Sequence, residues 1–178
     1  MRVSITVFLT LLTFVTITGC YSNKQSSPPF PLPAVFFHQP DSVLAPRLTD
    51  PKSFAAFIQQ IQSECDSYFS KIRPRNPQTL DVVVIVKPEQ KSRFWLVYQP
   101  PVINTLRDQA LTERLQRLTP PPVKKGPVSF TLRLLLWGAN EPDPSQPRNL
   151  FLPQEWHKAA GTNDVPFPDG IMSKVWPD

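Results

Sequence analysis

Apolar side chains between residues 51 and 72 recur in steps of three and four positions, with glutamines, serines and acids between them. This spacing predicts an amphipathic helix with one buried stripe. Thr49 or Asp50 is expected to cap the helix, and Pro51 suits its first position because the missing N–H needs no partner there. The predicted stripe consists of Phe54, Phe57, Ile58, Ile61, Cys65, Tyr68, Phe69 and Ile72.

Two runs of β-branched and aromatic residues, at 80–86 and 93–98, predict a pair of strands. The polar connector between them, 87–92, contains Pro88 and no glycine. This composition favours an antiparallel hairpin with a loose loop over a tight primed turn.

A second helical pattern begins at Thr105, which resembles the start of a capping box with Asp108 in place of the usual glutamate or glutamine. The prolines at 120–122 are expected to end this helix. Its predicted apolar arc consists of Leu106, Ala110, Leu111, Leu115 and Leu118.

The clearest alternation of apolar and polar residues lies between residues 128 and 137, and it predicts a strand with one covered face. Its second set of side chains begins polar and ends with Leu135 and Trp137, which are expected to contact another segment such as the C-terminal tail. The order helix, strand, strand, helix, strand predicts an α+β fold: a small two-layer sandwich with two helices on one face of a three-stranded antiparallel sheet. The inward set is Val128, Phe130, Leu132, Leu134 and Leu136.

The first twenty residues have the pattern of an export signal: one cation at Arg2, an uncharged apolar stretch at 3–17, then small residues and Cys20. The apolar stretch is shorter than the roughly 20 residues that a spanning helix needs. Its end, Ile17-Thr18-Gly19-Cys20, resembles the lipobox of bacterial lipoproteins. That resemblance implies acylation of Cys20, which becomes the new N-terminus. The alternatives are an ordinary secretory signal with a chance cysteine, or a retained anchor helix.

Composition and pattern divide the chain into four parts. We expect a lipoprotein signal peptide at 1–19, a lipidated proline-rich tether at 20–50, an α+β domain at 51–138 and a proline-rich C-terminal extension at 139–178. All 23 prolines lie after the signal, and they favour extended segments. Trp156 and Trp176 indicate that the extension packs on the domain, because a disordered tail is poor in such residues. Within the extension, 153–160 is a predicted short helix, and Pro166, Pro168 and Gly170 predict an extended end.

The charge balance excludes a nucleic-acid partner. Without the signal the chain keeps 18 basic and 14 acidic side chains, and the cations are scattered. Anionic headgroups or cell-wall polymer are the anionic partners expected in an envelope compartment. Cys65 lies on the apolar face of the first helix, where we expect it to act as a small hydrophobe, with an intermolecular disulfide as the alternative.

No motif in the sequence predicts an enzyme. The two histidines, His38 and His157, have no second histidine or cysteine at metal-ligand spacing. The sequence contains no serine in a Gly-x-Ser-x-Gly turn, no glycine-rich phosphate-binding loop and no Cys-x-x-Cys-His motif for haem attachment. We therefore expect no catalytic activity, no cofactor and no metal.

From residue 51 to residue 138 the order of elements resembles the C-terminal domain of the TonB and TolA families. This resemblance implies a protein-binding module whose last strand is an exposed edge that accepts an extended peptide from a partner. An alternative is that the C-terminal segment covers this edge. The partner-binding residues implied on the solvent face of the strand are Ser129, Thr131 and Arg133. The residues that carry the likeness are Leu106, Ala110, Leu111, Leu115 and Leu118, followed by Gly126, Pro127, Val128 and the alternating strand.

These observations predict a lipid-anchored envelope protein whose periplasmic domain binds a protein partner, as an accessory component of a transport, secretion or envelope-spanning assembly. Tyr21, in place of aspartate after the lipidated cysteine, resembles the sorting signal for the outer membrane. The alternative function is a structural tether that binds cell-wall polymer or another anionic surface. The basic residues for that alternative are Lys71, Arg73, Arg75, Lys124 and Lys125.

Overall fold

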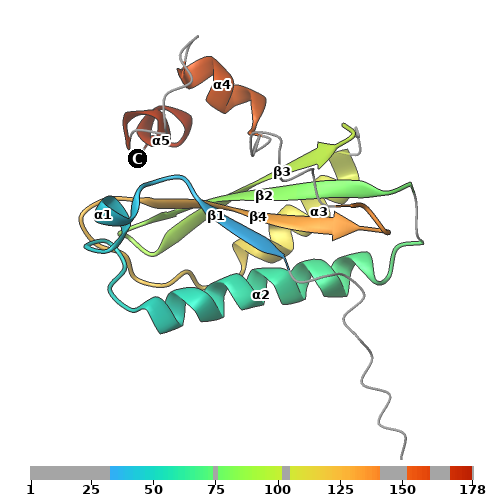
Figure 1. The fold of residues 1–178 in the computed structure, drawn as a ribbon, viewed down its shortest axis with the longest axis horizontal. Coiled ribbons are helices and arrows are strands. Elements are labelled where there is room, and N and C mark those ends of the chain that lie inside the picture. Colours follow the sequence, from blue (N-terminus) through green and yellow to red (C-terminus); the bar gives the residue numbers. More distant parts are fainter. Residues whose placement is uncertain (1–32, 74–75, 102–104, 141–151, 161–168, 178) are drawn as a thin grey trace, which may run out of the picture.

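The computed structural model describes residues 33–73, 76–101, 105–140, 152–160 and 169–177. These residues form an α+β fold with a four-stranded antiparallel sheet in the order β1-β4-β2-β3, which has helices on both faces (Figure 1). The predicted fold class is confirmed, whereas the signal peptide, Cys20 and the start of the tether lie outside the described residues. The elements are β1 (Ala34–Phe37), α1 (Asp41–Leu44), α2 (Pro51–Phe69), β2 (Gln78–Lys87), β3 (Lys91–Gln99), α3 (Thr105–Gln116), β4 (Val128–Leu136), α4 (Gln154–Ala160) and α5 (Asp169–Val175).

β1 differs from the expectation, because it lies in the segment assigned to a tether. It pairs antiparallel with β4, from Ala34 opposite Arg133 to Phe37 opposite Phe130. The run Ala-Val-Phe-Phe lies between Pro33 and Pro40, so the prolines flank the strand and leave its N–H groups available. The sheet therefore has four strands where three were expected, and the folded unit begins before residue 51.

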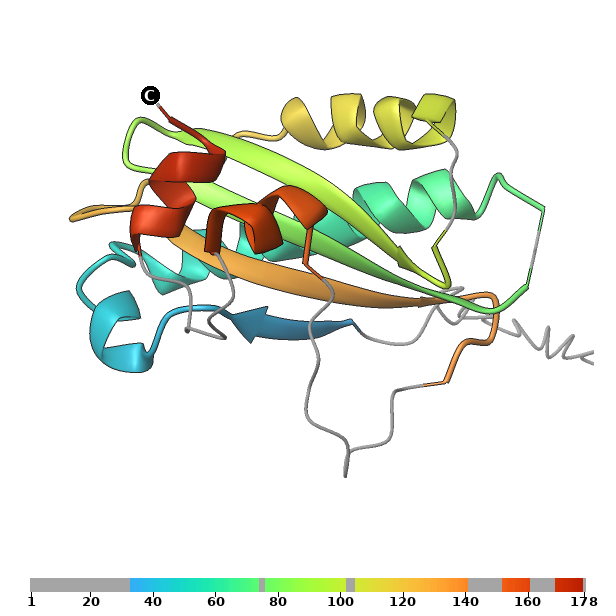
Figure 2. The same ribbon diagram turned by 90° about the horizontal axis from the view of Figure 1, so that it is seen from above.

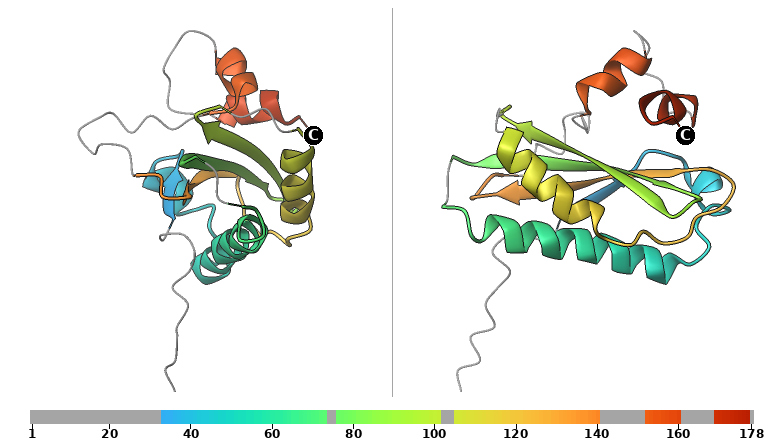
Figure 3. Two further views of the ribbon diagram at one scale, coloured as in Figure 1. Left: turned by 90° about the vertical axis from the view of Figure 1, so that its right-hand side faces the viewer. Right: turned by 180° about the vertical axis from the view of Figure 1, so that it is seen from behind.

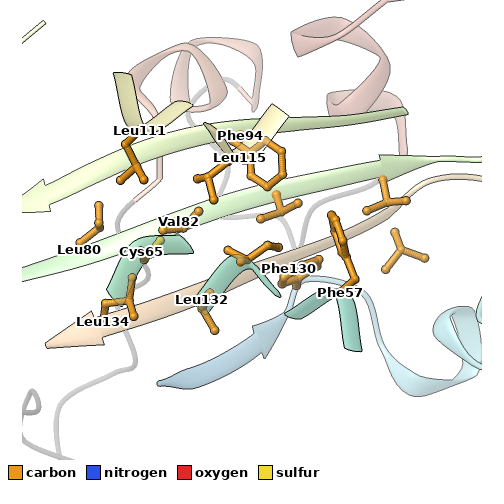
Figure 4. Packing of buried hydrophobic residues seen from close by; sticks show 14 of the residues in the cluster. Phe57, Cys65, Leu80, Val82, Phe94, Leu111, Leu115, Phe130, Leu132 and Leu134 are labelled. Atoms are coloured by element: carbon orange, nitrogen blue, oxygen red, sulfur yellow. The ribbon is translucent and has the colours of Figure 1, made fainter. Parts of the chain in front are cut away.

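The main core lies between the sheet and helices α2 and α3 (Figure 4). Asp50 caps α2 as predicted, since its side chain accepts a hydrogen bond of 2.9 Å from the Lys52 N–H. The buried stripe of α2 also follows the predicted spacing, and burial of each large apolar side chain contributes about 1.5–3 kcal/mol. Its buried residues are Phe54, Phe57, Ile61, Cys65 and Phe69.

The apolar arc predicted for α3 is correct only in part. Leu111 and Leu115 are fully buried, but Leu106 is 82% exposed and Ala110 is also exposed. At 3.6 residues per turn, Leu106 lies about 140° around the helix from Leu111. A helix that contacts the sheet through the Leu111–Leu115 stripe therefore turns Leu106 toward solvent.

The hairpin between β2 and β3 is tighter than expected. Strand pairing continues to Lys87 opposite Lys91, which leaves three residues in the turn. Gln90 adopts a φ of 55°, and its N–H donates to the Lys87 carbonyl at 3.1 Å. A left-handed residue at the end of a three-residue loop is a common hairpin solution that needs no glycine-rich turn.

Helices α4 and α5 cover the other face of the sheet (Figures 2 and 3). There Trp156 and Met172 pack on Val83 and Ile85 in a second, smaller apolar cluster. The helix expected at 153–160 is present as α4, Gln154–Ala160. The extended end predicted after it is wrong, because Asp169–Val175 is helical. Pro166 and Pro168 precede this helix in the sequence, so they do not interrupt it.

Candidate protein-binding site

The residues predicted to bind a partner are buried in the middle of the sheet. Ser129 and Thr131 have no exposed surface, and Arg133 is 5% exposed. Their strand, β4, is paired on one side with β1 and on the other with β2. The prediction that they face solvent on an open edge is therefore wrong. The one signal that could have corrected it is the Ala-Val-Phe-Phe run in the tether.

Ser129 and Thr131 instead bind His38, which follows β1. The His38 Nδ1 lies 2.7 Å from Ser129 Oγ, and Nε2 lies 2.9 Å from Thr131 Oγ1. Burial lowers the pKa of His38 to about 4, so the imidazole is neutral at pH 7. The ring of Trp156 meets the imidazole edge-on at 5.8 Å. His38 and Ser129 are both buried, and His38 lies against Trp156 of α4, so a substrate has no access to the Ser129 hydroxyl. The hydrogen bonds of His38 to Ser129 and Thr131 therefore serve to join β4 to the segment after β1.

Arg133 binds Asp81, which lies directly opposite on β2. Two hydrogen bonds of 2.8 and 2.7 Å join Arg133 to the two carboxylate oxygens. The guanidinium also lies 5.4 Å from the centre of the Phe36 ring on β1. Arg133 thus links three strands, and its buried guanidinium is occupied by contacts within the sheet.

The outer strands of the described sheet are β1 and β3, and β3 offers the longer edge. β3 has nine residues and β1 has four. One set of β3 side chains, including Phe94 and Tyr98, belongs to the main core, and the other, including Trp95 and Val97, packs beside the α4 cluster. An outer strand of this length presents a row of main-chain groups that can pair with another chain.

A groove of about 910 Å³ lies along the second half of β3. Helix α3 contributes one wall through Asp108, and the start of α4 contributes the other. Figure 3 shows the two helices on opposite faces of the sheet beside β3. The lining consists of Trp95, Leu96, Val97, Tyr98, Gln99, Pro101, Asp108, Leu152, Pro153, Gln154, Glu155, His157 and Lys158.

Trp95 is held in place at the α4 wall of this groove. Its indole N–H donates to the Glu155 carboxylate, and its ring meets Trp156 edge-on at 5.3 Å. The guanidinium of Arg93 lies 4.9 Å from the centre of the Trp95 ring and donates to the Val175 carbonyl at 3.2 Å. These contacts join α4 and α5 to the edge strand, so the wall is preorganised.

The basic residues of the alternative function do not form one patch. Lys124 lies near the start of α2, since its N–H donates to the Arg47 carbonyl at 3.0 Å, and Lys125 follows it. Lys71 and Arg73 lie just beyond the other end of this 19-residue helix, which is about 28 Å long. All four are exposed, and Arg75 lies outside the described residues.

The part of the chain that the structure describes contains no group of three or more histidine, cysteine or acidic residues that could hold a metal ion. His157 is exposed on α4. Cys65 is a buried free thiol whose pKa is raised above its usual range, chiefly by burial and then by Asp66 and Glu64. A protonated thiol in the core acts as a small apolar side chain, in agreement with the sequence.

Comparison with known proteins finds no family model, no curated protein and no solved structure that matches the chain. Among the helices of the described residues, none is both long and apolar enough to span a bilayer.

Proposed function

We propose that this chain is a lipid-anchored envelope protein, acylated at Cys20, whose domain binds a protein partner at the open edge of β3. Its role is that of an accessory, non-catalytic component of a transport, secretion or envelope-spanning assembly. The observation that carries the proposal is a nine-residue outer strand beside a groove with walls from two helices. Main-chain pairing supplies affinity at such an edge, and the groove supplies selectivity.

The point where the tether enters the domain supports this assignment. The lipobox-like cysteine precedes Pro33 by 13 residues, which can span at most roughly 45 Å. The next residue begins β1, at the opposite side of the sheet from β3. The anchor thus holds the domain near a bilayer and leaves the β3 edge available to a partner.

The polymer-binding alternative receives less support. Lys71 and Arg73 lie at one end of α2, whereas Lys124 and Lys125 lie at the other, so an extended anion meets two separate cation pairs. Binding through these cations would weaken steeply as salt rises, whereas strand pairing with apolar contacts would persist. Complexes recovered at high salt therefore favour the protein-binding function.

Metabolic labelling with palmitate tests the anchor. The parent chain should incorporate label and the Cys20→Ser variant should not. Equal labelling of both chains would refute acylation at this residue.

A photocrosslinking amino acid placed at Val97 in living cells tests the binding edge. A discrete adduct of higher mass is expected at position 97, stable to high salt. The matched control is the same amino acid at Val35, on the opposite outer strand, where no such adduct is expected. Adducts at position 35 alone, or at neither position, would contradict binding at β3.

A further inference from the structure

We propose that helices α4 and α5 form a C-terminal cover that separates from the sheet as one unit while the sheet, α2 and α3 stay folded, and that acid favours the separated state. This property goes beyond the proposed function, since it needs neither the anchor nor a partner. It follows from the packing of the cover, the contacts at its rim and the histidine that it encloses.

The apolar contact between the cover and the sheet is the smaller of the two in the described domain. Trp156 of α4 and Met172 of α5 meet Val83 and Ile85 in one cluster of buried side chains. The cluster between the sheet and helices α2 and α3 contains most of the other buried apolar residues. Local opening begins where the least apolar surface is buried, so the cover should open before the main core. Because Trp156 and Met172 share one cluster and the two helices contact each other, α4 and α5 should open together.

The polar side chains next to the cover are bonded within the sheet layer. His38 is hydrogen-bonded to Ser129 and Thr131 of β4, at 2.7 and 2.9 Å. The Gln39 side chain accepts from the Ser129 N–H at 3.0 Å. Separation breaks the weaker bond of 3.6 Å from Gln39 to the Met172 sulfur and leaves these other bonds in place. The sheet can therefore keep this polar group intact when the cover leaves.

Polar contacts hold the rim of the cover. Arg47 binds Asp169 at the start of α5, and half of the Asp169 side chain is exposed. The hydrogen bond from the Trp95 indole to Glu155 of α4 is also exposed. Ion pairs at such positions contribute little to stability, because water and salt screen them. Further rim contacts are the hydrogen bond of 3.2 Å from Arg93 to the Val175 carbonyl and the contact of 4.7 Å between the Lys87 ammonium and the Trp176 ring.

The cover encloses a side chain that gains a proton more readily once water reaches it. His38 is 8% exposed, and the Trp156 ring lies edge-on to it at 5.8 Å. Burial lowers the pKa of His38 to about 4, whereas the pKa of an imidazole in water is about 6.5. The separated state therefore binds more protons between these two values, and acid shifts the equilibrium toward it. From pH 7.5 to pH 5 the separated fraction should rise by up to about thirtyfold.

Other titratable groups lie on the elements around His38. His157 is exposed on α4, so separation barely alters its surroundings. The pKa of Asp169 is lowered, chiefly by the hydrogen bond from Arg47, so this carboxylate stays ionised at pH 5 and its contact persists. The variant His38→Gln keeps all of these groups and so isolates the effect of the enclosed ring. The remaining charged groups on the surrounding elements are Asp41, Asp81, Lys87, Arg133, Glu155, Lys158 and Lys174.

Hydrogen–deuterium exchange of the full chain in detergent tests the cover, with rates at pH 7.5 and 5 divided by the intrinsic exchange rate at each pH. Helices α4 and α5 should share one opening equilibrium, which rises roughly ten- to thirtyfold at pH 5. Helix α2 and strand β2 should stay protected at both pH values. His38→Gln should reduce the rise to less than about threefold, whereas the matched control His157→Gln should keep it.

Several results would overturn the inference. Exchange of α4 and α5 only together with α2 and β2 would show that the domain opens as a whole. Different opening equilibria for α4 and α5 would exclude a single unit, and the absence of a rise at pH 5 would exclude an acid-sensitive one. These three comparisons use the parent protein alone, so they decide the matter even where His38→Gln does not fold. Equal rises in the parent and His38→Gln, or loss of the rise in His157→Gln, would exclude the enclosed histidine as the acid-sensitive group.

Discussion

Arg133 on β4 and Asp81 on β2 form a two-hydrogen-bond ion pair inside the sheet, and both side chains are buried. The alternation along β4 makes Arg133 appear to face solvent, and the structure shows why it does not. The edge of β4 beside it is occupied by β1, where Ala34 lies opposite Arg133, and Asp81 lies opposite it on β2. The polar row that resembles a binding surface is therefore an internal contact between strands.

Replacement of one partner of this pair should be costly. Arg133→Leu removes two charge-assisted hydrogen bonds from a buried carboxylate, so the free energy of unfolding should fall by about 3–5 kcal/mol in urea titration. The double variant Asp81→Leu, Arg133→Leu should recover most of this loss, because neither charge of the pair is left buried without the other. A single variant with the parental urea midpoint would contradict the buried ion pair.

Acid should weaken the fold through His38. Its pKa is lowered to about 4 by burial, against 6.5 in the unfolded chain, so between these values the unfolded state binds more protons. The contribution of neutral His38 to the free energy of unfolding is therefore present above pH 6.5 and is lost as the pH falls toward 4. At pH 5 the free energy of unfolding should be lower by about 2 kcal/mol. Urea titrations at pH 7.5 and 5 measure the loss.

The matched control for this pH dependence is His38→Gln, which keeps a polar side chain and removes the titrating ring. The side chains of Ser129 and Thr131, on the two ring nitrogens, do not titrate in this range. The variant should lose less stability than the parent between pH 7.5 and 5. An identical loss in both proteins would assign the effect to other groups.

Arg47 should hold α5 on the domain. It donates to both carboxylate oxygens of Asp169, at the start of α5, and to the Pro127 carbonyl at 2.6 Å. The hydrogen bond from Arg47 lowers the pKa of Asp169. Arg47→Met should therefore accelerate tryptic cleavage after Lys174 in α5, with Lys124→Met as the control for loss of a nearby cation. Cleavage at the parental rate would show that α5 is held elsewhere.

Leu106 and Leu111 of α3 were both predicted to be buried from the helical spacing, but only Leu111 is buried in the structure. Leu111→Ala removes a fully buried side chain and should cost about 2–5 kcal/mol. Leu106→Ala should change stability by less than about 0.5 kcal/mol, because the side chain is exposed. Urea titration of both variants measures the contrast. Similar losses would place Leu106 in the core, as the sequence pattern predicted.

Local patterns predicted most of the fold. The cap at Asp50, the α2 stripe and the period-two strand β4 each depend on neighbouring residues, and all three are present. β1 was missed because a four-residue run has no measurable period, and its pairing with β4 depends on contacts almost a hundred positions away. The groove escaped prediction for the same reason, since it joins β3, Asp108 and the start of α4.

The boundary of the folded unit provides the last prediction. A fragment of residues 51–138 contains every element of the α+β domain expected from the sequence but lacks β1, α4 and α5. In it, β4 would have an open edge, and Val83 and Ile85 would lose Trp156 and Met172. Phe130 would also lose the Phe37 ring, whose centre lies 6.0 Å away. We expect this fragment to unfold at a lower urea concentration than residues 33–177 and to aggregate through β4. Equal midpoints for the two fragments, measured by circular dichroism, would show that the flanking elements add no stability.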